Sequence, residues 1–150
     1  MSVSGLDEIG GRILVIFDGS CGFCNRAVRW LLARDRRDRL RFVASESAKV
    51  AGILARPGLD APVAANGPGT MLVVRDAGGP AEMVLVRSDA VVTLLRELPR
   101  PWLGVGVVLK WIPRPLRDLG YRLVACWRYR IWGRLESCPV PTAEERARFL

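Results

Sequence analysis

Two cysteines separated by two residues stand near the start of the chain, in Cys21-Gly-Phe-Cys24. A nucleophilic cysteine must be a thiolate, and free cysteine, with a pKa of about 8.5, is mostly a thiol at neutral pH. The first turn of a helix favours the anion, because it presents unpaired backbone N–H groups and the positive end of the helix dipole. If Cys21 stands there, Cys24 lies one turn deeper on the same side and can attack a mixed disulfide at Cys21. The pair predicts thiol–disulfide exchange, with Cys21 attacking and Cys24 resolving.

The residues between the two cysteines fit this chemistry. We expect Gly22 to leave the approach to Cys21 open and Phe23 to offer an apolar contact to a substrate. A C-x-x-C pair also begins many zinc sites, but zinc takes four ligands, commonly two close cysteine pairs or cysteines with histidines. This chain has no histidine, and eleven residues separate its other cysteines, Cys126 and Cys138. A redox pair is therefore favoured over a zinc site or structural thiols, and no cofactor or metal is expected.

Asp18 precedes Cys21 by three residues and has two interpretations. It can be a turn residue whose carboxylate accepts nearby backbone N–H groups. It can instead be a partly buried general base that takes the proton of Cys24 when Cys24 attacks. Its negative charge would also disfavour a thiolate, so both interpretations stay open.

Hydrophobic patterning predicts the elements that position these residues. The apolar run over 12–18 ends at Asp-Gly, which is typical of a buried strand entering a turn. Ser20 can cap a following helix whose apolar face includes Cys24 and Val28. A second strand is expected at Leu40–Ala44. Strand, helix and strand within this length predict a right-handed unit with parallel strands.

The chain continues with a short helix expected over 47–55, a loop rich in Pro, Gly and Ala over 57–69, a hairpin of strands 71–75 and 83–86, and a helix over 89–98 capped by Ser88. This order is that of an α/β, thioredoxin-like three-layer sandwich with a four-stranded mixed sheet. We expect a single domain with its core at about 12–98.

Beyond the core, a helical extension is expected over about 101–150. Helices at 102–111 and 116–132 are predicted on either side of Ile112-Pro-Arg-Pro115, and four of the five tryptophans fall in this region. We expect the tryptophans to pack as core, because tryptophan is usually buried on average. Alternatively, Trp127, Tyr129 and Trp132, interleaved with arginines, form a docking surface.

The composition restricts the classes of protein. The chain has 150 residues, half of them hydrophobic, and a net charge of +8. No DNA- or RNA-binding motif accompanies the basic residues, so a solvated basic face is expected rather than nucleic-acid binding. No apolar stretch approaches the roughly 20 residues of a membrane span, and the start lacks the pattern of a secretory signal. A cytoplasmic protein is expected, with peripheral membrane contact left open.

The segment Phe17-Asp-Gly-Ser-Cys-Gly-Phe-Cys-Asn25 resembles the opening signature of the DCC family of thiol–disulfide oxidoreductases, named for Asp-x-x-Cys-x-x-Cys. The resemblance continues through Trp30-Leu-Leu to Arg41-Phe42, Arg87-Ser-Asp-Ala-Val91, Ile112-Pro-Arg-Pro-Leu-Arg-Asp118, Tyr121-Arg-Leu-Val-Ala125, Arg128-Tyr-Arg130, Gly133 and Cys138. It implies a thioredoxin-like fold and a redox dithiol at Cys21 and Cys24, with Asp18 as the family's leading acid. It does not supply a substrate.

Two functions follow as hypotheses. The first is exchange with a protein or small-molecule disulfide, recharged by a cellular thiol reductant. The second is a non-catalytic module that docks a partner or a membrane surface through the basic aromatic C-terminal helix. The prolines around Cys138 must turn the chain, so we expect the tail to fold back over the domain. There Cys138 either anchors the tail as a buried thiol or takes the disulfide from Cys21.

Overall fold

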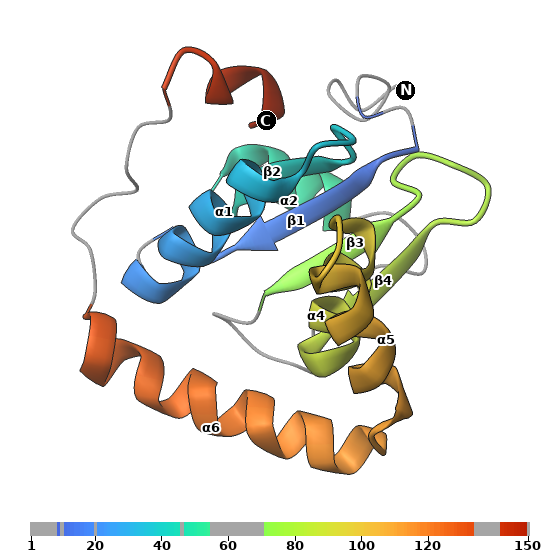
Figure 1. Cartoon of the computed structure of the whole chain (residues 1–150). Helices are drawn as coiled ribbons and strands as arrows, with labels where there is room; N and C mark the ends of the chain where they lie inside the picture. Colours follow the sequence, from blue (N-terminus) through green and yellow to red (C-terminus); the bar gives the residue numbers. More distant parts are fainter. Residues whose placement is uncertain are drawn as a thin grey trace.

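A four-stranded mixed sheet forms the centre of the computed structural model, which describes residue 9 and residues 11–19, 21–45, 47–54, 71–133 and 142–149. The strands lie in the order β2-β1-β3-β4 (Figure 1). Their bounds are Ile13–Phe17 for β1, Leu40–Ala44 for β2, Leu72–Arg75 for β3 and Met83–Val86 for β4. β1 pairs with β2 in parallel and with β3 antiparallel, and β3 pairs with β4 antiparallel. The predicted thioredoxin-like α/β fold is confirmed.

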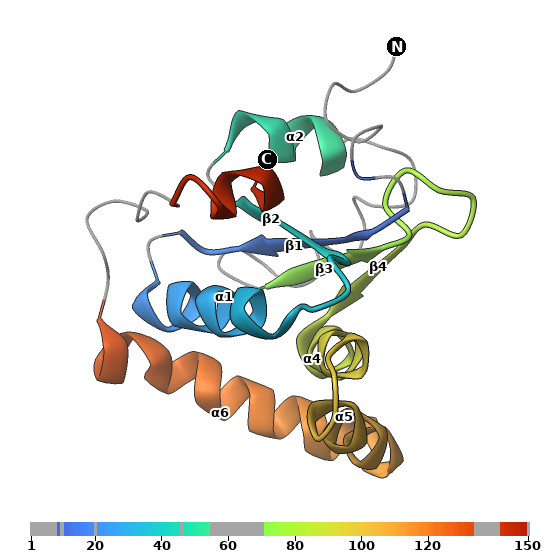
Figure 2. The same ribbon diagram turned by 45° about the horizontal axis from the view of Figure 1, so that its top comes forward.

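Helices cover both faces of this sheet (Figure 2). α1 (Gly22–Arg34) and α4 (Arg87–Glu97) lie on one face, and α2 (Ala48–Leu54) lies on the other. α1 connects β1 to β2, so the predicted parallel unit of strand, helix and strand is present. The loop expected over 57–69 lies outside the described residues.

β1 is buried along its whole length because its neighbours cover both of its faces. Successive side chains of a strand point to opposite faces. Ile13, Val15 and Phe17 therefore pack in the core beneath α1 and α4. Leu14 and Ile16 pack in the second core, on the side of α2.

The C-terminal helices form a further layer on the side of α1 and α4 (Figure 2). α5 spans Trp102–Trp111 and α6 spans Arg114–Trp132. α6 begins two residues earlier than expected, because Pro115 fits the first turn of a helix, where its missing N–H costs no hydrogen bond. Among the described residues, no helix is long and apolar enough to cross a bilayer.

Polar contacts attach the start of α6 to the start of α4. The carboxylate of Asp118 accepts hydrogen bonds from the hydroxyl of Ser88 and from its backbone N–H, the latter at 3.4 Å. Asp89 pairs with Arg114 at 2.9 Å and with Arg117 at 3.1 Å. The prediction that Ser88 caps α4 is wrong, because its hydroxyl donates to Asp118 and the helix already begins at Arg87.

The tryptophans of the extension do not all join the core. Trp102 is partly buried and meets Trp30 edge to face, with 4.7 Å between ring centroids. Trp111 is 85% exposed and Trp127 is 51% exposed. The expectation of core packing is right for Trp102 and wrong for these two: Trp111 ends α5 in solvent, and α6 directs Asp118 and Arg117 rather than Trp127 toward α4. The side chain of Trp132 lies outside the described residues.

Residues 142–149 return to the domain and close the edge of the sheet at β2. Phe149 pairs with Phe42 as an isolated bridge and lies against the ring of Phe17, with 6.3 Å between centroids. Arg148 contacts the carboxylates of Asp35 and Asp38, at 3.8 and 3.3 Å. The predicted return of the tail is confirmed for these residues, whereas Cys138 lies outside the described ones.

Replacing Ser88 with alanine tests the attachment of α6. The Ser88 hydroxyl, by donating to Asp118, holds the pKa of that carboxyl below its usual range. A lowered folded pKa means that the contribution to stability is present above the unfolded pKa of about 3.9 and is lost as pH falls through the folded value. We expect S88A to lower the free energy of unfolding by about 1 kcal/mol at neutral pH. The loss should shrink below a pH of about 4.

Urea titration at neutral and acidic pH measures this effect. The matched control is Ser45→Ala, at an exposed serine after β2, which should change stability little. Equal unfolding of the two variants at both pH values would contradict the assigned contact.

Candidate active site

Cys21 is the N-cap of α1, the helix that follows β1. Its backbone is extended, with φ −89° and ψ 119°, and the helix begins at Gly22. The backbone N–H of Cys24 donates to the Sγ atom of Cys21 at 3.3 Å. Cysteine sulfur thus takes the place that a serine or aspartate oxygen fills in most helix caps. The prediction that Ser20 caps this helix is wrong, and Ser20 itself lies outside the described residues.

A short turn holds Cys21 at the end of β1. The backbone N–H of Cys21 donates to the carbonyl of Asp18 at 3.2 Å. From the next turn of α1, the Asn25 side-chain amide donates to the carbonyls of Gly19, at 2.8 Å, and Cys21, at 2.9 Å. Asn25 therefore fixes the turn that carries Cys21. Sequence reasoning did not assign it a role, although it directly follows Cys24 in the motif.

Both cysteines of the pair are buried. Cys21 has no exposed surface and Cys24 is 2% exposed, and neither forms a disulfide. The backbone N–H of Gly22 faces the carbonyl of Gly133, just past the end of α6, at 3.4 Å. Gly133 has a φ of +71°, a conformation that favours glycine. The expected open approach to Cys21 is therefore wrong, because Cys21 is fully buried in the packed start of α1.

Asp18 is also buried, with 7% of its surface exposed. It directly follows β1, so the strand fixes its position relative to Cys21. Its main-chain carbonyl takes part in the turn, as the bond to Cys21 shows. A turn role and a proton-accepting role for its carboxylate are both compatible with this placement.

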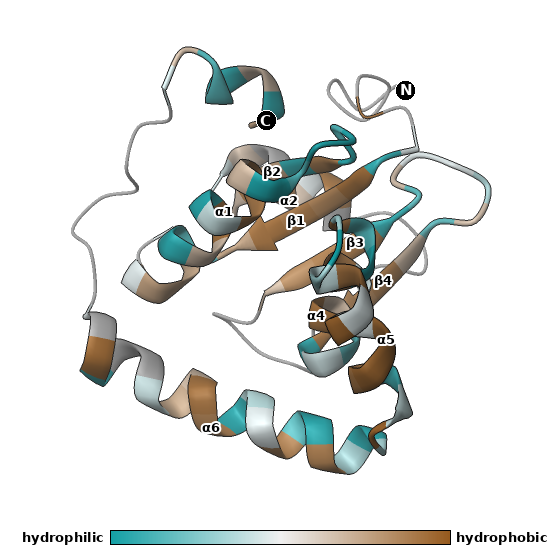
Figure 3. Cartoon of the chain, in the orientation of Figure 1, coloured by the Kyte–Doolittle hydropathy of each residue, from teal (hydrophilic) through white to brown (hydrophobic). Residues whose placement is uncertain are grey.

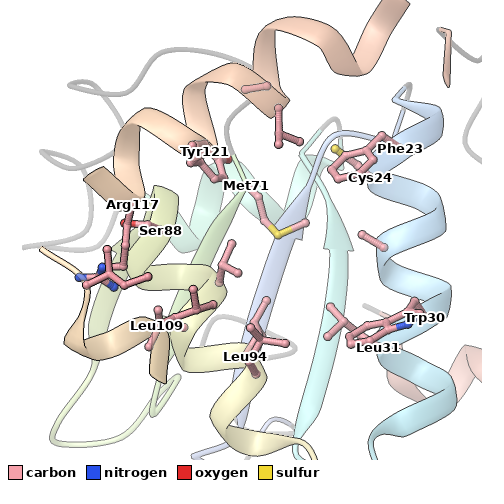
Figure 4. A pocket seen from close by; sticks show the side chains of 18 of the residues that line it. Phe23, Cys24, Trp30, Leu31, Met71, Ser88, Leu94, Leu109, Arg117 and Tyr121 are labelled. Carbon is pink, nitrogen blue, oxygen red and sulfur yellow. The ribbon is translucent and has the colours of Figure 1, made fainter. Parts of the chain in front are cut away.

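A cavity of about 540 Å³ adjoins Cys24 and lies between α1, α4, α5 and α6. Figure 4 shows Phe23 and Cys24 of α1 on one side, Tyr121 and Arg117 of α6 on another, and Met71 between them. Apart from Ser88, Arg117 and Tyr121, its lining is apolar or glycine, with Cys24 as its thiol. α1 and Met71 build it together with the three consecutive helices α4, α5 and α6, which come more than fifty residues after α1, so no local sequence signal could have revealed it.

Of the two remaining cysteines, only Cys126 belongs to the described part of the chain, and it does not line the cavity. Cys126 is exposed on α6. No group of three His, Cys, Asp or Glu residues is placed to hold a metal ion, as far as the described residues extend. Cys21 and Cys24 thus stand as a pair, with Asp18 as the nearby carboxylate in sequence.

A thioredoxin-like sheet with Cys-x-x-Cys at the start of the helix after β1 is the arrangement of the thiol–disulfide oxidoreductase class. The family model described as DCC1-like thiol-disulfide oxidoreductase matches residues 15–134. The chain belongs to this family.

Two curated proteins are similar over most of the chain. The Uncharacterized protein YuxK of Bacillus subtilis (strain 168) is 28% identical over 96% of this chain and 97% of its own length. The chloroplastic DCC family protein At1g52590 of Arabidopsis thaliana is 28% identical over 85% of this chain and 69% of its own length. No solved structure matches.

The segments that carry the resemblance in sequence contact one another in space. Ser88 and Asp89 of one segment bind Asp118 and Arg117 of another. Gly133 lies against the helix start that carries the cysteine pair. The motif and the C-terminal helices therefore belong to one structural unit around the cavity.

The burial of the pair predicts an order of alkylation. In the native reduced protein, limiting iodoacetamide should label Cys126 before Cys21 or Cys24, because only exposed thiols meet the reagent without a structural opening. Peptide mapping by mass spectrometry measures the order, and the same dose in denaturant should remove the difference. Faster labelling of Cys21 than of Cys126 in the folded protein would contradict the closed arrangement.

Proposed function

We propose that the chain catalyses thiol–disulfide exchange, with Cys21 as the attacking thiol and Cys24 as the resolving thiol. The observation that carries the proposal is the N–H of Cys24 directed at the sulfur of Cys21, at 3.3 Å, at the start of α1. A hydrogen-bond donor and a helix N-terminus both favour negative charge on sulfur. Membership in the DCC1-like family supports the same chemistry.

The reaction proceeds by two exchanges of sulfur partners. The Cys21 thiolate attacks one sulfur of a substrate disulfide, and the other sulfur leaves as a thiolate that takes up a proton. Cys24 then loses its proton and attacks Cys21, and the second substrate thiol leaves. Two electrons have passed from the dithiol to the substrate, and a Cys21–Cys24 disulfide remains. A cellular thiol reductant restores the dithiol. The predicted cytoplasmic location suits this step, because the cytoplasm keeps thiols reduced.

The surroundings of the pair restrict its substrates. Because Cys21 has no exposed surface, its attack requires the structure around it to open. Cys24 borders the apolar cavity, so a disulfide with an apolar neighbouring group suits the site better than a highly charged one. Protein and small-molecule disulfides both meet this description.

Mixed-disulfide trapping tests the division of roles. Without a resolving thiol, Cys24→Ser should accumulate a mixed disulfide at Cys21 with a model disulfide such as a labelled peptide, whereas Cys21→Ser should accumulate far less. Cys126→Ser should be made in both backgrounds, because Cys126 is exposed and would trap substrate nonspecifically. Non-reducing mass spectrometry measures the adducts. Equal trapping by both variants would contradict the assignment of Cys21 as the attacking thiol and Cys24 as the resolving thiol.

A variant of Asp18 tests the proton acceptor. If the carboxylate takes the proton of Cys24, Asp18→Asn should slow resolution of the mixed disulfide by roughly 10- to 100-fold, which is at the modest end of general-base effects. The midpoint of thermal unfolding should barely change. Stopped-flow measurement of thiol release gives the rate. A large loss of stability with unchanged release would instead assign Asp18 to the turn alone.

A further inference from the structure

An exposed apolar stripe runs along α6. Leu116, Leu119, Leu123, Trp127 and Ile131 recur every three or four residues, and each is between 51% and 62% exposed. α5 continues this surface with Val108 and Trp111, which are 65% and 85% exposed. We call these seven residues the outer face; Figure 3 shows brown segments along both helices.

An ordinary amphipathic helix buries its apolar stripe, whereas α6 turns only part of its apolar residues toward the domain: Val124 and Ala125 line the cavity, and the stripe stays exposed. Two polar residues fix the side that meets the domain: Asp118 binds Ser88, and Arg117 binds Asp89. Tyr121, one turn further along, lines the cavity. These contacts fix the rotation of α6 against the domain, and the apolar residues outside the contact side remain exposed.

Positive charge accompanies the outer face. Residues 100–133 contain seven lysines and arginines and a single acidic residue, Asp118. That carboxylate is directed at Ser88. Lys110, Arg122 and Arg130 are exposed on the two helices, and the guanidinium of Arg130 lies 5.4 Å from the ring centre of Trp127. The face therefore combines apolar side chains, tryptophan and cations.

We infer that the outer face binds the surface of an anionic lipid bilayer, with α5 and α6 lying in the interface. Apolar side chains enter the boundary between head groups and acyl chains, and arginines contact acidic head groups. Tryptophan suits this boundary because its ring is apolar and its N–H is polar. A second copy of this chain fits less well, because it would bring two faces of the same charge together. The inference does not depend on the redox chemistry.

Vesicle binding by the purified full chain tests this inference. Sedimentation with phosphatidylcholine vesicles, with and without phosphatidylglycerol, measures the partition coefficient. Binding should require the anionic lipid and should weaken as salt is added, because salt screens the arginines. Tryptophan emission should shift to shorter wavelength on binding.

Two double variants separate the apolar contribution to vesicle binding from the electrostatic one. Replacing Leu119 and Leu123 together with glutamine should lower the partition coefficient by about tenfold or more, because apolar burial is lost. Replacing Arg122 and Arg130 with glutamine should lower it by about fivefold for each arginine removed. All of these positions are exposed, so the variants should keep the wild-type unfolding midpoint.

The matched controls lie on the β3–β4 hairpin, away from α5 and α6 (Figure 1). Met83 is 51% exposed and Arg75 is exposed. Met83→Gln and Arg75→Gln should leave vesicle binding unchanged. Absence of binding to anionic vesicles by the folded wild-type chain would overturn the inference. So would a dimer, seen by light scattering, that the double leucine variant dissociates, because a second copy would then cover the face.

Discussion

The pairing of β1 with a strand on each side determines where the chain leaves the sheet, and the position of the cysteine pair depends on it. β1 bonds to β2 and to β3, and its side chains are buried on both faces. These pairings and this burial fix the position of Phe17, the last residue of β1. They therefore also fix the position of the turn that begins at Asp18. Cys21 follows that turn as the N-cap of α1, and one helical turn sets the distance to Cys24. The reactivity we propose is thus a consequence of how a buried strand ends.

α6 takes part in two surfaces of different character. Toward the domain, Asp118 of α6 binds Ser88 of α4, and other residues of α6 form part of the cavity wall. Gly133, just past the end of α6, lies against Gly22. Away from the domain, α6 presents the outer face. Leu116 belongs to both, since it lines the cavity and is largely exposed. Movement of α6 would therefore alter the cavity beside Cys24 and the outer face together.

The sequence predicted the features that local patterns determine and missed those that distant contacts determine. The bounds of β2 and β4 agree with the prediction, because apolar runs and flanking turn residues are local signals. The prediction that Ser88 caps α4 was wrong because the partner of its hydroxyl, Asp118, lies thirty residues away in the sequence. The pattern of α6 shows an apolar stripe but not which side of the helix meets the domain, so the exposure of Trp127 could not be read from it. The contact of Gly133 with Gly22, beside Cys21, likewise joins residues more than a hundred positions apart.

The bridge between Phe149 and Phe42 bears on how the protein is synthesised. β2 is an edge strand of the described sheet, and the segment that protects it comes about a hundred residues later in the sequence. While the ribosome is still making α4, α5 and α6, the backbone N–H and C=O groups on that edge have no cover from residues 142–149. An open edge can pair with another nascent chain. Translation speed through the C-terminal helices therefore sets how long each new molecule is exposed to aggregation.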